Sequence, residues 1–528
     1  MSPFALHPGS PGIWVLRGKR WRSAIAALLV SSSVQATTYS IVTLGDGVVN
    51  DGDCTLREAL MAAEADLEVD LCPAGGTSDE IVLSLSGTYS FGLGQQALTG
   101  AASLVSIRGA NAAQWQSYIV DLEGANRFLT VDSGAQVSLR DLVIRNGDVR
   151  GNPQNSEGGA LFVGEASMTL EHLRIEASKA HSGGGLAFIG FLPGALVLRD
   201  VSFSGNEAEA EAAFDLAEGG GLCVVRFDAD SSVTFSDVTF ENNLARAEIT
   251  DSNAYGAGLF FWLRNAGRGD LQRLHFSGNQ LRGGGGGGLG GAALAAWLDD
   301  YDANAVYPNL RLRDVAVDSN TLVGASETIY GLAIDLQVLL GSSAWLDRIT
   351  LRGDGAAISA PHLRVLSQSG NTTLANVLAV DGPSRGVEVD QEGGGSVLLG
   401  HMTSSGHATD EVALSNTGPG TVRLENSIVW GDGVADLILN GTVDIAAENL
   451  FGIDPQFVNP GANDFELAST SPAVDAGDAT LVSVGALDAR HRPRVAGLKA
   501  DLGALERGSV FGDGFDSGDT GAWSQSHL

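Results

Sequence analysis

Four aspartates recur at one position of a repeated sequence pattern and could supply the carboxylates of an active site. Paired carboxylates act as acid and base in glycoside hydrolysis, and carboxylates that hold calcium beside a basic residue serve in a polysaccharide lyase. An active site is local, however, whereas a residue that recurs in repeat after repeat is typical of a structural turn. We therefore predict turn formers, and no catalytic residue, at Asp141, Asp200, Asp237 and Asp314.

Two histidines and two further segments are weaker candidates for chemistry. His401 and His407 share one repeat but fall at two different corners, and we expect both to face solvent. The run Gly283–Gly288 could cradle a phosphate, but no lysine follows it and no helix start is signalled, so we interpret it as a turn. Three aspartates of the tail recur at every third residue, which departs from an EF-hand loop. A flexible tail is therefore favoured over calcium binding, the one cofactor left open, at Asp513, Asp516 and Asp519.

The stretch from Val233 to Asn243 shows the repeat that must position these residues. Counting from Val233, apolar residues occupy offsets 0, 2, 5 and 7, an aspartate occupies offset 4, and an asparagine occupies offset 10. Apolar residues at every second position predict a strand with one buried face. The shift after Phe235 predicts a turn at Asp237 before a second short strand begins. The repeat therefore encodes two strands and a corner.

The same pattern recurs along most of the chain with variable spacing. Polar or glycine-rich insertions follow the asparagine position, and a third strand marked by small residues follows each insertion, as in Gly219-Gly-Gly-Leu222. Strands of constant size with insertions at one corner are typical of a parallel β-helix, and parallel crossovers are right-handed. We therefore predict an all-β protein, a right-handed parallel β-helix of the pectin-lyase-like kind. Its repeats begin at positions 137, 168, 196, 233, 269, 310, 344, 372, 397 and 422.

The repeated asparagines have a structural interpretation. Asparagine tolerates left-handed backbone, and its amide can bond to the asparagine one coil away. We predict that four of them stack as a ladder at the corner from which the insertions leave: Asn206, Asn243, Asn279 and Asn320.

Composition restricts the class of partner. The chain has 528 residues, of which 71 are glycine and 44 % are hydrophobic, so it can bury a long core. Acidic residues outnumber basic ones by 63 to 31, which gives a formal net charge of −32. This charge excludes electrostatic binding of nucleic acid or of an anionic membrane surface.

Residues 1–36 have the three-part pattern of a secretory signal. Basic residues between Arg17 and Arg22 precede the apolar run Ala24–Val30, and Ala36 ends a cleavage site. The apolar run is far shorter than the roughly 20 residues that span a bilayer, and no later segment is long and apolar enough to cross one. The pattern predicts export, with no transmembrane segment.

Three cysteines in an exported chain suggest one disulfide and one remaining thiol. Cys54 and Cys72 flank a single local segment, and we predict that they form the disulfide. Cys223 lies within a repeat strand, where we expect a small buried side chain rather than a reactive thiol.

The segment after Cys54 opens a helix with a capping box, in which Thr55 and Glu58 satisfy each other's backbone. The motif resembles the signature of the CSLREA domain, with threonine in place of serine, over roughly residues 38–70. Such domains lie at the N-terminus of exported bacterial β-helix proteins. The resemblance implies a location and an N-terminal cap, not an activity, and rests on Cys54-Thr-Leu-Arg-Glu-Ala59.

Two further resemblances concern the repeats and the C-terminal block. The repeats resemble the paired motifs of polymorphic outer-membrane proteins, a family of β-helical surface adhesins, as in Phe203-Ser-Gly-Asn206, Phe240-Glu-Asn-Asn243 and Gly158-Gly-Ala-Leu161. Residues 422–506 are similar to the choice-of-anchor Q domain of exported bacterial β-helix proteins. That resemblance rests on Asp454-Pro-Gln-Phe457, Ser471-Pro-Ala-Val-Asp-Ala-Gly477 and Asp501-Leu-Gly-Ala-Leu-Glu506. Because proline and polar residues break the repeat in this block, we expect it to cover the exposed strand edge at the end of the solenoid.

Together these observations predict an exported, non-catalytic surface protein that binds a polysaccharide, or the surface of a host or neighbouring cell, through a face of the β-helix. The alternative is a calcium-dependent polysaccharide lyase or a glycoside hydrolase. The expected divisions are a signal peptide, an N-terminal cap, the β-helix, a C-terminal cap and a tail, at 1–36, 37–102, 103–450, 451–506 and 507–528.

Overall fold

The computed structural model describes residues 36–508 except for 101–103, 152–155, 229, 266, 301–306, 325–327, 357–359, 383, 432–434 and 479–486. Nearly all of the expected signal peptide and tail therefore lies outside the described residues, as do Asp513, Asp516 and Asp519. Among the described helices, none is long and apolar enough to cross a membrane.

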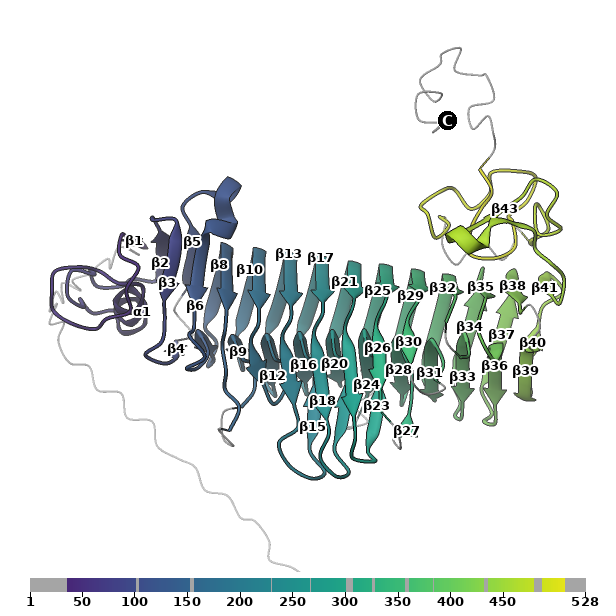
Figure 1. Cartoon of the computed structure of the whole chain (residues 1–528), viewed down its shortest axis with the longest axis horizontal. Coiled ribbons are helices and arrows are strands. Elements are labelled where there is room, and N and C mark those ends of the chain that lie inside the picture. Colours follow the sequence, from purple (N-terminus) through teal and green to yellow (C-terminus); the bar gives the residue numbers. More distant parts are fainter. Residues whose placement is uncertain are drawn as a thin grey trace, which may run out of the picture.

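A wall of parallel strands runs along the whole solenoid, with one long strand per coil through its middle (Figure 1). Val137, Met168, Leu196 and Val233 pair in sequence, and the pairing stays in register as far as Val422. The predicted parallel β-helix is therefore confirmed. The long strands of this wall are β1 (Ala36–Ile41), β2 (Ser78–Leu83), β5 (Leu104–Gly109), β8 (Gln136–Arg145), β10 (Ser167–Glu176), β13 (Ala195–Ser204), β17 (Ser232–Glu241), β21 (Arg268–Ser277), β25 (Asn309–Asp318), β29 (Ser343–Arg352) and β32 (Asn371–Val380).

Shorter strands continue this wall at its two ends. At the N-terminal end they are β3 (Gly87–Ser90) and β6 (Tyr118–Asp121), with the 3-10 helix η1 (Ala112–Ser117) between β5 and β6. At the C-terminal end they are β34 (Ser396–Gly400), β35 (Thr403–Ser405), β37 (Thr421–Glu425), β38 (Ser427–Trp430), β40 (Asp444–Ile445) and β41 (Asn449–Phe451).

A second parallel wall closes the solenoid and contains the strands predicted after the insertions. Its inward residues and those of the first wall form one continuous core. Its strands are β4 (Gln96–Leu98), β7 (Leu129–Val131), β9 (Leu161–Val163), β12 (Leu186–Gly190), β16 (Leu222–Arg226), β20 (Leu259–Arg264), β24 (Leu294–Asp299), β28 (Ile334–Leu339), β31 (Leu363–Gln368), β33 (Val387–Gln391), β36 (Asp410–Asn416) and β39 (Ala435–Gly441).

Most of the long strands bend at offset 4, where the backbone is left-handed. The φ angle lies between 52° and 59° at the four predicted corner aspartates, Asp141, Asp200, Asp237 and Asp314. Aspartate tolerates this region better than most residues because its short polar side chain can bond locally. The bend lets one ten-residue strand supply two sides of each coil.

The insertions build a side extension below the middle of the solenoid (Figure 1). One or two short strands leave each of these middle coils at the insertion, and they enclose a second, alanine-rich core that includes Ala208, Ala245 and Leu281. One sheet consists of β11 (Lys179–Ala180), β14 (Glu207–Glu209), β18 (Leu244–Ala247), β22 (Gln280–Gly283), β26 (Thr321–Val323) and β30 (Gly355–Ala356). The other consists of β15 (Leu216–Glu218), β19 (Asn253–Tyr255), β23 (Gly288–Gly290) and β27 (Thr328–Ile329).

The N-terminal end of the solenoid is closed by helix α1 (Leu56–Ala65). The Oγ1 atom of Thr55 accepts from the Glu58 amide at 3.1 Å, and the Glu58 carboxylate accepts from the Thr55 amide at 3.0 Å. Leu56 and Leu60 of this helix belong to the solenoid core. Strands β1 and β2 flank the helix. β1 pairs in register with β2, and β2 pairs in register with β5, so the stack of strands begins before the expected start at 103.

The C-terminal block lies against the side of the solenoid (Figure 1). Its two antiparallel strands are β42 (Phe457–Asn459) and β43 (Asp464–Leu467), joined by the 3-10 helix η2 (Pro460–Ala462). Phe465 and Leu505 pack on the outward residues Leu378 and Val380. The expectation that this block covers the last strand edge was wrong, because these apolar outward positions attract it to the flank and Leu439 of the last coil stays 49 % exposed.

Candidate functional site

The four asparagines of the predicted ladder lie in one fully buried column. The Nδ2 atom of Asn206 donates to Oδ1 of Asn243 at 3.1 Å, and the next two steps, to Asn279 and to Asn320, are 2.9 Å each. Each Nδ2 also donates to a backbone carbonyl of a neighbouring coil, as Asn243 does to Phe203. Because the amides are enclosed and mutually bonded, this column is structural rather than available to a ligand.

The column continues into a buried chain of acids and histidines. Asn320 donates to Oδ1 of Asp354 at 3.2 Å, and Oδ2 of Asp354 lies 2.8 Å from Nε2 of His362. Nδ1 of His362 lies 3.3 Å from Nε2 of His407, whose Nδ1 lies 2.6 Å from Glu411. The expectation that His407 faces solvent was therefore wrong. Its partners come from a preceding coil and from four residues further on, which no periodic pattern reveals.

His401 is also buried, contrary to expectation, because the C-terminal block covers it. It occupies the left-handed corner position, with a φ angle of 54°. Burial, followed by the positive charge of Arg494, lowers the pKa of His401 to about 3. A neutral imidazole enclosed in this way packs the junction between solenoid and block and does not meet solvent.

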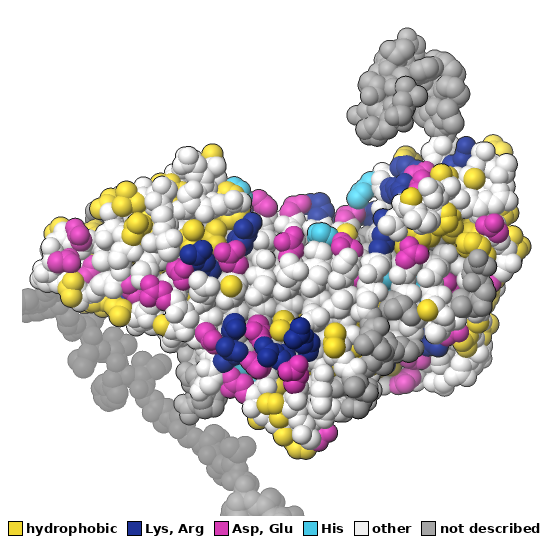
Figure 2. Space-filling model, viewed as in Figure 1, with side chains coloured by type: hydrophobic (Ala, Val, Ile, Leu, Met, Phe, Trp, Pro, Cys, Tyr) yellow, Lys and Arg dark blue, Asp and Glu magenta, His cyan; other side chains and the backbone are white. Residues whose placement is uncertain are grey.

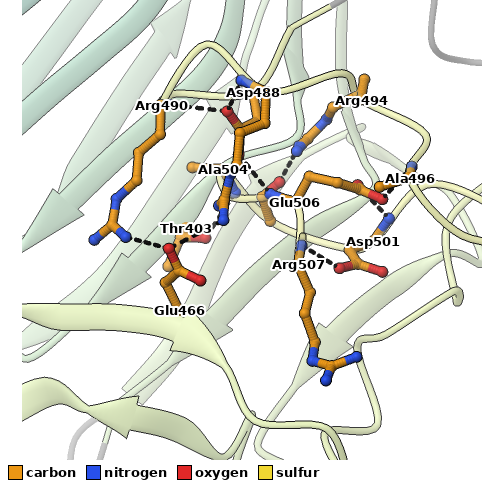
Figure 3. Close-up of polar contacts among 12 residues, drawn as sticks. Thr403, Glu466, Asp488, Arg490, Arg494, Ala496, Asp501, Ala504, Glu506 and Arg507 are labelled. Carbon is orange, nitrogen blue, oxygen red and sulfur yellow. Dashed lines mark hydrogen bonds and ion pairs between the residues drawn. The ribbon is translucent and has the colours of Figure 1, made fainter. Parts of the chain in front are cut away.

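An ionic cluster fixes the C-terminal block (Figure 3). The amide of Glu506 donates to Asp488 at 2.8 Å, and the amide of Asp501 donates to Glu506 at 2.9 Å. The amide of Ala504 donates to Thr403 at 2.8 Å and so joins the block to the solenoid. Burial, and less strongly the charge of Asp501, raise the pKa of Glu506 to about 7 despite the backbone hydrogen bonds that it accepts.

The corner aspartates are engaged in ion pairs along the solenoid. Oδ1 of Asp237 lies 2.6 Å from Nε of Arg273, and Oδ1 of Asp314 lies 2.5 Å from Nε of Arg348 and 2.7 Å from Nε2 of His491. A pocket of about 340 Å³ opens beside Asp314. Burial raises the pKa of Asp314, but the hydrogen bonds and charges of Arg348 and His491 outweigh burial and lower it. Carboxylates held ionised by these partners are unsuited to act as general acids.

Charged side chains also gather on the side extension, where acidic and basic groups are intermixed (Figure 2). Nη1 of Arg150 lies 2.6 Å from Glu209, and Nζ of Lys179 lies 3.3 Å from Glu207. Arg246 contacts both of these glutamates. Within the described part of the chain, no group of three or more histidine, cysteine or acidic side chains is arranged to hold a metal ion. The charged side chains named here therefore pair with one another within the extension.

Six aromatic residues form a continuous row on the outer face of the second wall, which we call the aromatic row. Neighbouring ring centroids are 4.7 Å apart for Phe191 and Phe227, 5.5 Å for Phe227 and Trp262, and 5.6 Å for Trp262 and Trp297. Tyr255 continues the row at 5.0 Å from Trp297 and 6.3 Å from Tyr330. The row consists of Phe191, Phe227, Trp262, Trp297, Tyr255 and Tyr330.

The positions of these rings follow from the strand pattern. Trp262 of β20 and Trp297 of β24 are paired residues at the outward fourth position of their strands. Tyr255 of β19 and the nearby Tyr330 come from the side extension, which meets the second wall here. Phe191 is 68 % exposed, and both tryptophans are half-buried. The row is therefore a strip of aromatic rings with part of its ring surface open to solvent.

Ion pairs flank the aromatic row at Trp262 and at Tyr330, its last member. Nε of Arg264 lies 3.0 Å from Asp299, which also accepts from Nε1 of Trp262 at 3.3 Å. The guanidinium of Arg264 lies 4.7 Å from the Trp262 ring centroid. Arg364 pairs with Asp335 at 3.1 Å and lies 5.2 Å from the Tyr330 ring centroid. The strip thus alternates apolar ring faces with balanced polar groups.

Sequence reasoning did not identify the aromatic row. A local signal exists, because the same spacing separates a small-residue run from each tryptophan in Gly258-Leu-Phe-Phe-Trp262 and Ala293-Leu-Ala-Ala-Trp297. The contribution of Tyr255 and Tyr330 depends on how the side extension folds against the wall, and the repeat alone does not predict that contact.

No family model matches the sequence, and no curated protein matches it. Among solved structures, the chain is similar to a pectate lyase, Pel9A, with 13 % identity, coverage of 90 % of this chain and 97 % of that one, and a TM-score of 0.37. It is also similar to the A-module of the Azotobacter vinelandii mannuronan C-5 epimerase AlgE4, with 14 % identity, coverage of 79 % and 97 %, and a TM-score of 0.30. By its own strand order and register, the chain is a right-handed parallel β-helix.

Proposed function

We propose that this protein is an exported, non-catalytic surface protein that binds a polysaccharide along the aromatic row. The observation that carries the proposal is the unbroken sequence of ring contacts from Phe191 to Tyr330 on one outer face. Export and surface display are supported by the signal pattern and by the resemblance of the N- and C-terminal segments to CSLREA and choice-of-anchor Q domains.

The chemistry of the row suits a chain of sugar rings. A sugar ring has an apolar face of C–H groups and an edge of hydroxyls, and an aromatic ring covers that face while nearby polar groups bond the edge. Arg264, Asp299, Asp335 and Arg364 supply donors and acceptors beside the rings. The row crosses coils spaced roughly 4.8 Å apart and so extends about 20 Å along the solenoid axis. Because the flanking charges are paired, the strip favours neutral over strongly acidic polysaccharides.

Binding without cleavage is supported by the state of the carboxylates. The acids beside the aromatic row, Asp299 and Asp335, are held by arginines, and the corner acids Asp237 and Asp314 lie on other sides of each coil. A glycosidase needs two carboxyl groups a few ångströms apart on opposite sides of one bond, with one of them protonated. Asp299, the acid that bonds Trp262 of the row, is paired with Arg264 rather than with a second carboxyl group.

The test measures retention and cleavage together. The mature protein is titrated with a panel of neutral and acidic polysaccharides, with and without calcium, while tryptophan fluorescence and new chain ends are recorded. Trp262→Ala and Trp297→Ala should each weaken binding about tenfold, since an aromatic contact contributes roughly 1–1.5 kcal/mol. Trp345→Ala is the matched control, because Trp345 lies in β29 of the other wall.

The proposal fails if Trp345→Ala weakens binding as much as the two row variants, or if none of the polysaccharides is retained. Steady formation of new chain ends would instead support the alternative of a calcium-dependent lyase or a glycoside hydrolase. In that case the carboxylates of the insertions after Asn206 and Asn243 are the first to replace.

A further inference from the structure

The C-terminal end of the solenoid exposes a strand edge and an open core. Strand β39 is the terminal strand of the second wall, and among the described residues it pairs only with β36 (Figure 1). Leu437 and Leu439 pair with the buried Val412 and Leu414, so they point toward the core. Leu439 is nevertheless 49 % exposed, because no described coil follows it.

Further apolar residues surround this edge. Val443, Ile445 and Phe451 of the last coil are only partly buried against the core, and Ile438, on the outer face of β39, is 40 % exposed. An exposed strand edge presents unpaired amide and carbonyl groups that pair readily with another strand. Such edges are usually protected by a lysine, a proline or a bulge. Strand β39 contains none of these residues, and its only charged residue is Asp436.

We propose that this end face joins a second copy of the chain, with β39 pairing antiparallel to the β39 of its partner about a two-fold axis. The sequence of the strand is nearly palindromic around Ile438, reading Ala-Asp-Leu-Ile-Leu-Asn-Gly from 435 to 441. In a pair centred on Ile438, Leu437 lies opposite Leu439 of the other copy. Asp436 then lies opposite an asparagine amide, which can donate to it.

The self-complementary register is what selects a second copy over another partner. A two-fold interface requires that the same surface match itself, and a palindromic strand meets that requirement at each position. The two-fold axis keeps the core-facing side of each strand on the same side of the joined sheet. The leucines of both copies therefore continue one apolar core through the interface, and they are shielded from water there.

Charge gives the interface a distinctive salt dependence. Each chain carries a formal net charge of −32, so two copies repel each other over long range. Salt screens repulsion between exposed charges and strengthens apolar burial. The dimer should therefore be favoured by raising the ionic strength, whereas an interface held by ion pairs would weaken.

The first experiment measures mass by analytical ultracentrifugation across a range of protein concentrations and at two salt concentrations. The full chain should associate to a dimer, more strongly at high salt, and Ile438→Lys should be monomeric. Leu340→Lys is the matched control, because Leu340 is 55 % exposed on the same wall but away from the end face, and it should leave the dimer intact. A monomeric full chain at all concentrations, or an Ile438→Lys variant that still dimerises, overturns the proposal.

The second experiment tests the register. Cys54 and Cys72 are bonded and Cys223 is buried, so Ile438→Cys introduces an accessible thiol among the described residues. Directly opposed side chains of an antiparallel pair have β-carbons about 4.5–5.5 Å apart, and mild oxidation should therefore link two chains covalently. Asn440→Cys should link far less. A monomer whose amides at 437–441 are protected from hydrogen exchange would mean that another segment covers the edge, and would refute the second copy.

Discussion

The two ends of the solenoid differ in how their capping segments cover the apolar core. At the N-terminal end, helix α1 places Leu56, Leu60 and Ala63 on the core with at most 1 % exposure, and the Cys54–Cys72 disulfide holds the segment. At the C-terminal end, a larger block lies on the flank, and the last coil keeps Leu439 half exposed. The difference shows that a capping segment closes a solenoid only where its apolar face meets the open core.

Packing on the flank has its own cause. The outward residues of the late coils are apolar, as at Leu378, Val380 and Ile428, and the block buries them with Phe465 and the residues around it. The same block would leave these residues in water if it covered the strand edge. The block can either bury these side-wall residues or close the end of the core. In this protein it buries the side-wall residues.

The largest loss of stability should come from a substitution at the closed, N-terminal end. Leu60→Ala removes a fully buried side chain at the cap, and we expect the free energy of unfolding to fall by about 3 kcal/mol. Leu439→Ala, at the open end, should lower it by less than about 1 kcal/mol, because that side chain is already 49 % exposed. Urea denaturation at a protein concentration that keeps the chain monomeric measures both. Equal losses at the two ends would contradict the comparison.

A slightly smaller effect should follow loss of the disulfide. Cys54 and Cys72 are separated by 18 residues and their α-carbons lie 5.0 Å apart. Opening a loop of this length should destabilise the cap by about 3 kcal/mol at most. In the double variant Cys54→Ser with Cys72→Ser, amide exchange should quicken in α1 and remain unchanged in β36. If exchange quickens equally in both elements, the disulfide does not act locally.

The asparagine column lies between the two ends and tests the solenoid itself. Asn243→Ala leaves Asn206 and Asn279 without their partner in a fully buried column, and we expect a loss of roughly 1–3 kcal/mol in the free energy of unfolding. Asn371→Ala, at an exposed asparagine of β32, is the control and should have little effect. Unchanged stability of Asn243→Ala would mean that the column is not held by these amides.

The smallest effect concerns pH at the C-terminal block. The pKa of Glu506 is about 7 in the folded block and 4.5 for an ordinary glutamate, so the folded state binds this proton more tightly. Its contribution to stability is therefore complete below about pH 4.5 and is lost as the pH rises through 7. His401 has the opposite effect. Its pKa is lowered from 6.5 to about 3, so its contribution to stability is lost as the pH falls below 6.5.

Comparing the Glu506→Gln variant with the original chain separates the pH effect of Glu506 from that of His401. Glu506→Gln removes the pH dependence that comes from Glu506 and keeps that from His401. Between pH 4.5 and 7, the melting temperature of this variant relative to the original chain should therefore rise. The exchange of α1 amides at the closed end should not differ between the two chains. A constant difference in melting temperature across that range would show that Glu506 does not take up the proton.

The repeat alone predicted the strands, their register and the corner at Asp237, because these depend on apolar spacing and on local backbone preferences within a few residues. The helix and its capping box were legible for the same reason, since Thr55 and Glu58 are three residues apart. The start of the stack could not be predicted in this way, because β1 and β2 pair in register although they lack the full repeat.

Features that depend on contacts between coils or between segments far apart in sequence could be found only in the folded molecule. His407 is buried because His362 and Glu411 meet it, and His401 is buried because Arg494 and its neighbours fold back over it. The aromatic row likewise exists only where the side extension brings Tyr255 and Tyr330 against Trp297. Local periodicity encodes each coil, but packing between surfaces decides which side chains are exposed, paired or enclosed, because burial is a property of neighbours that the repeat does not specify.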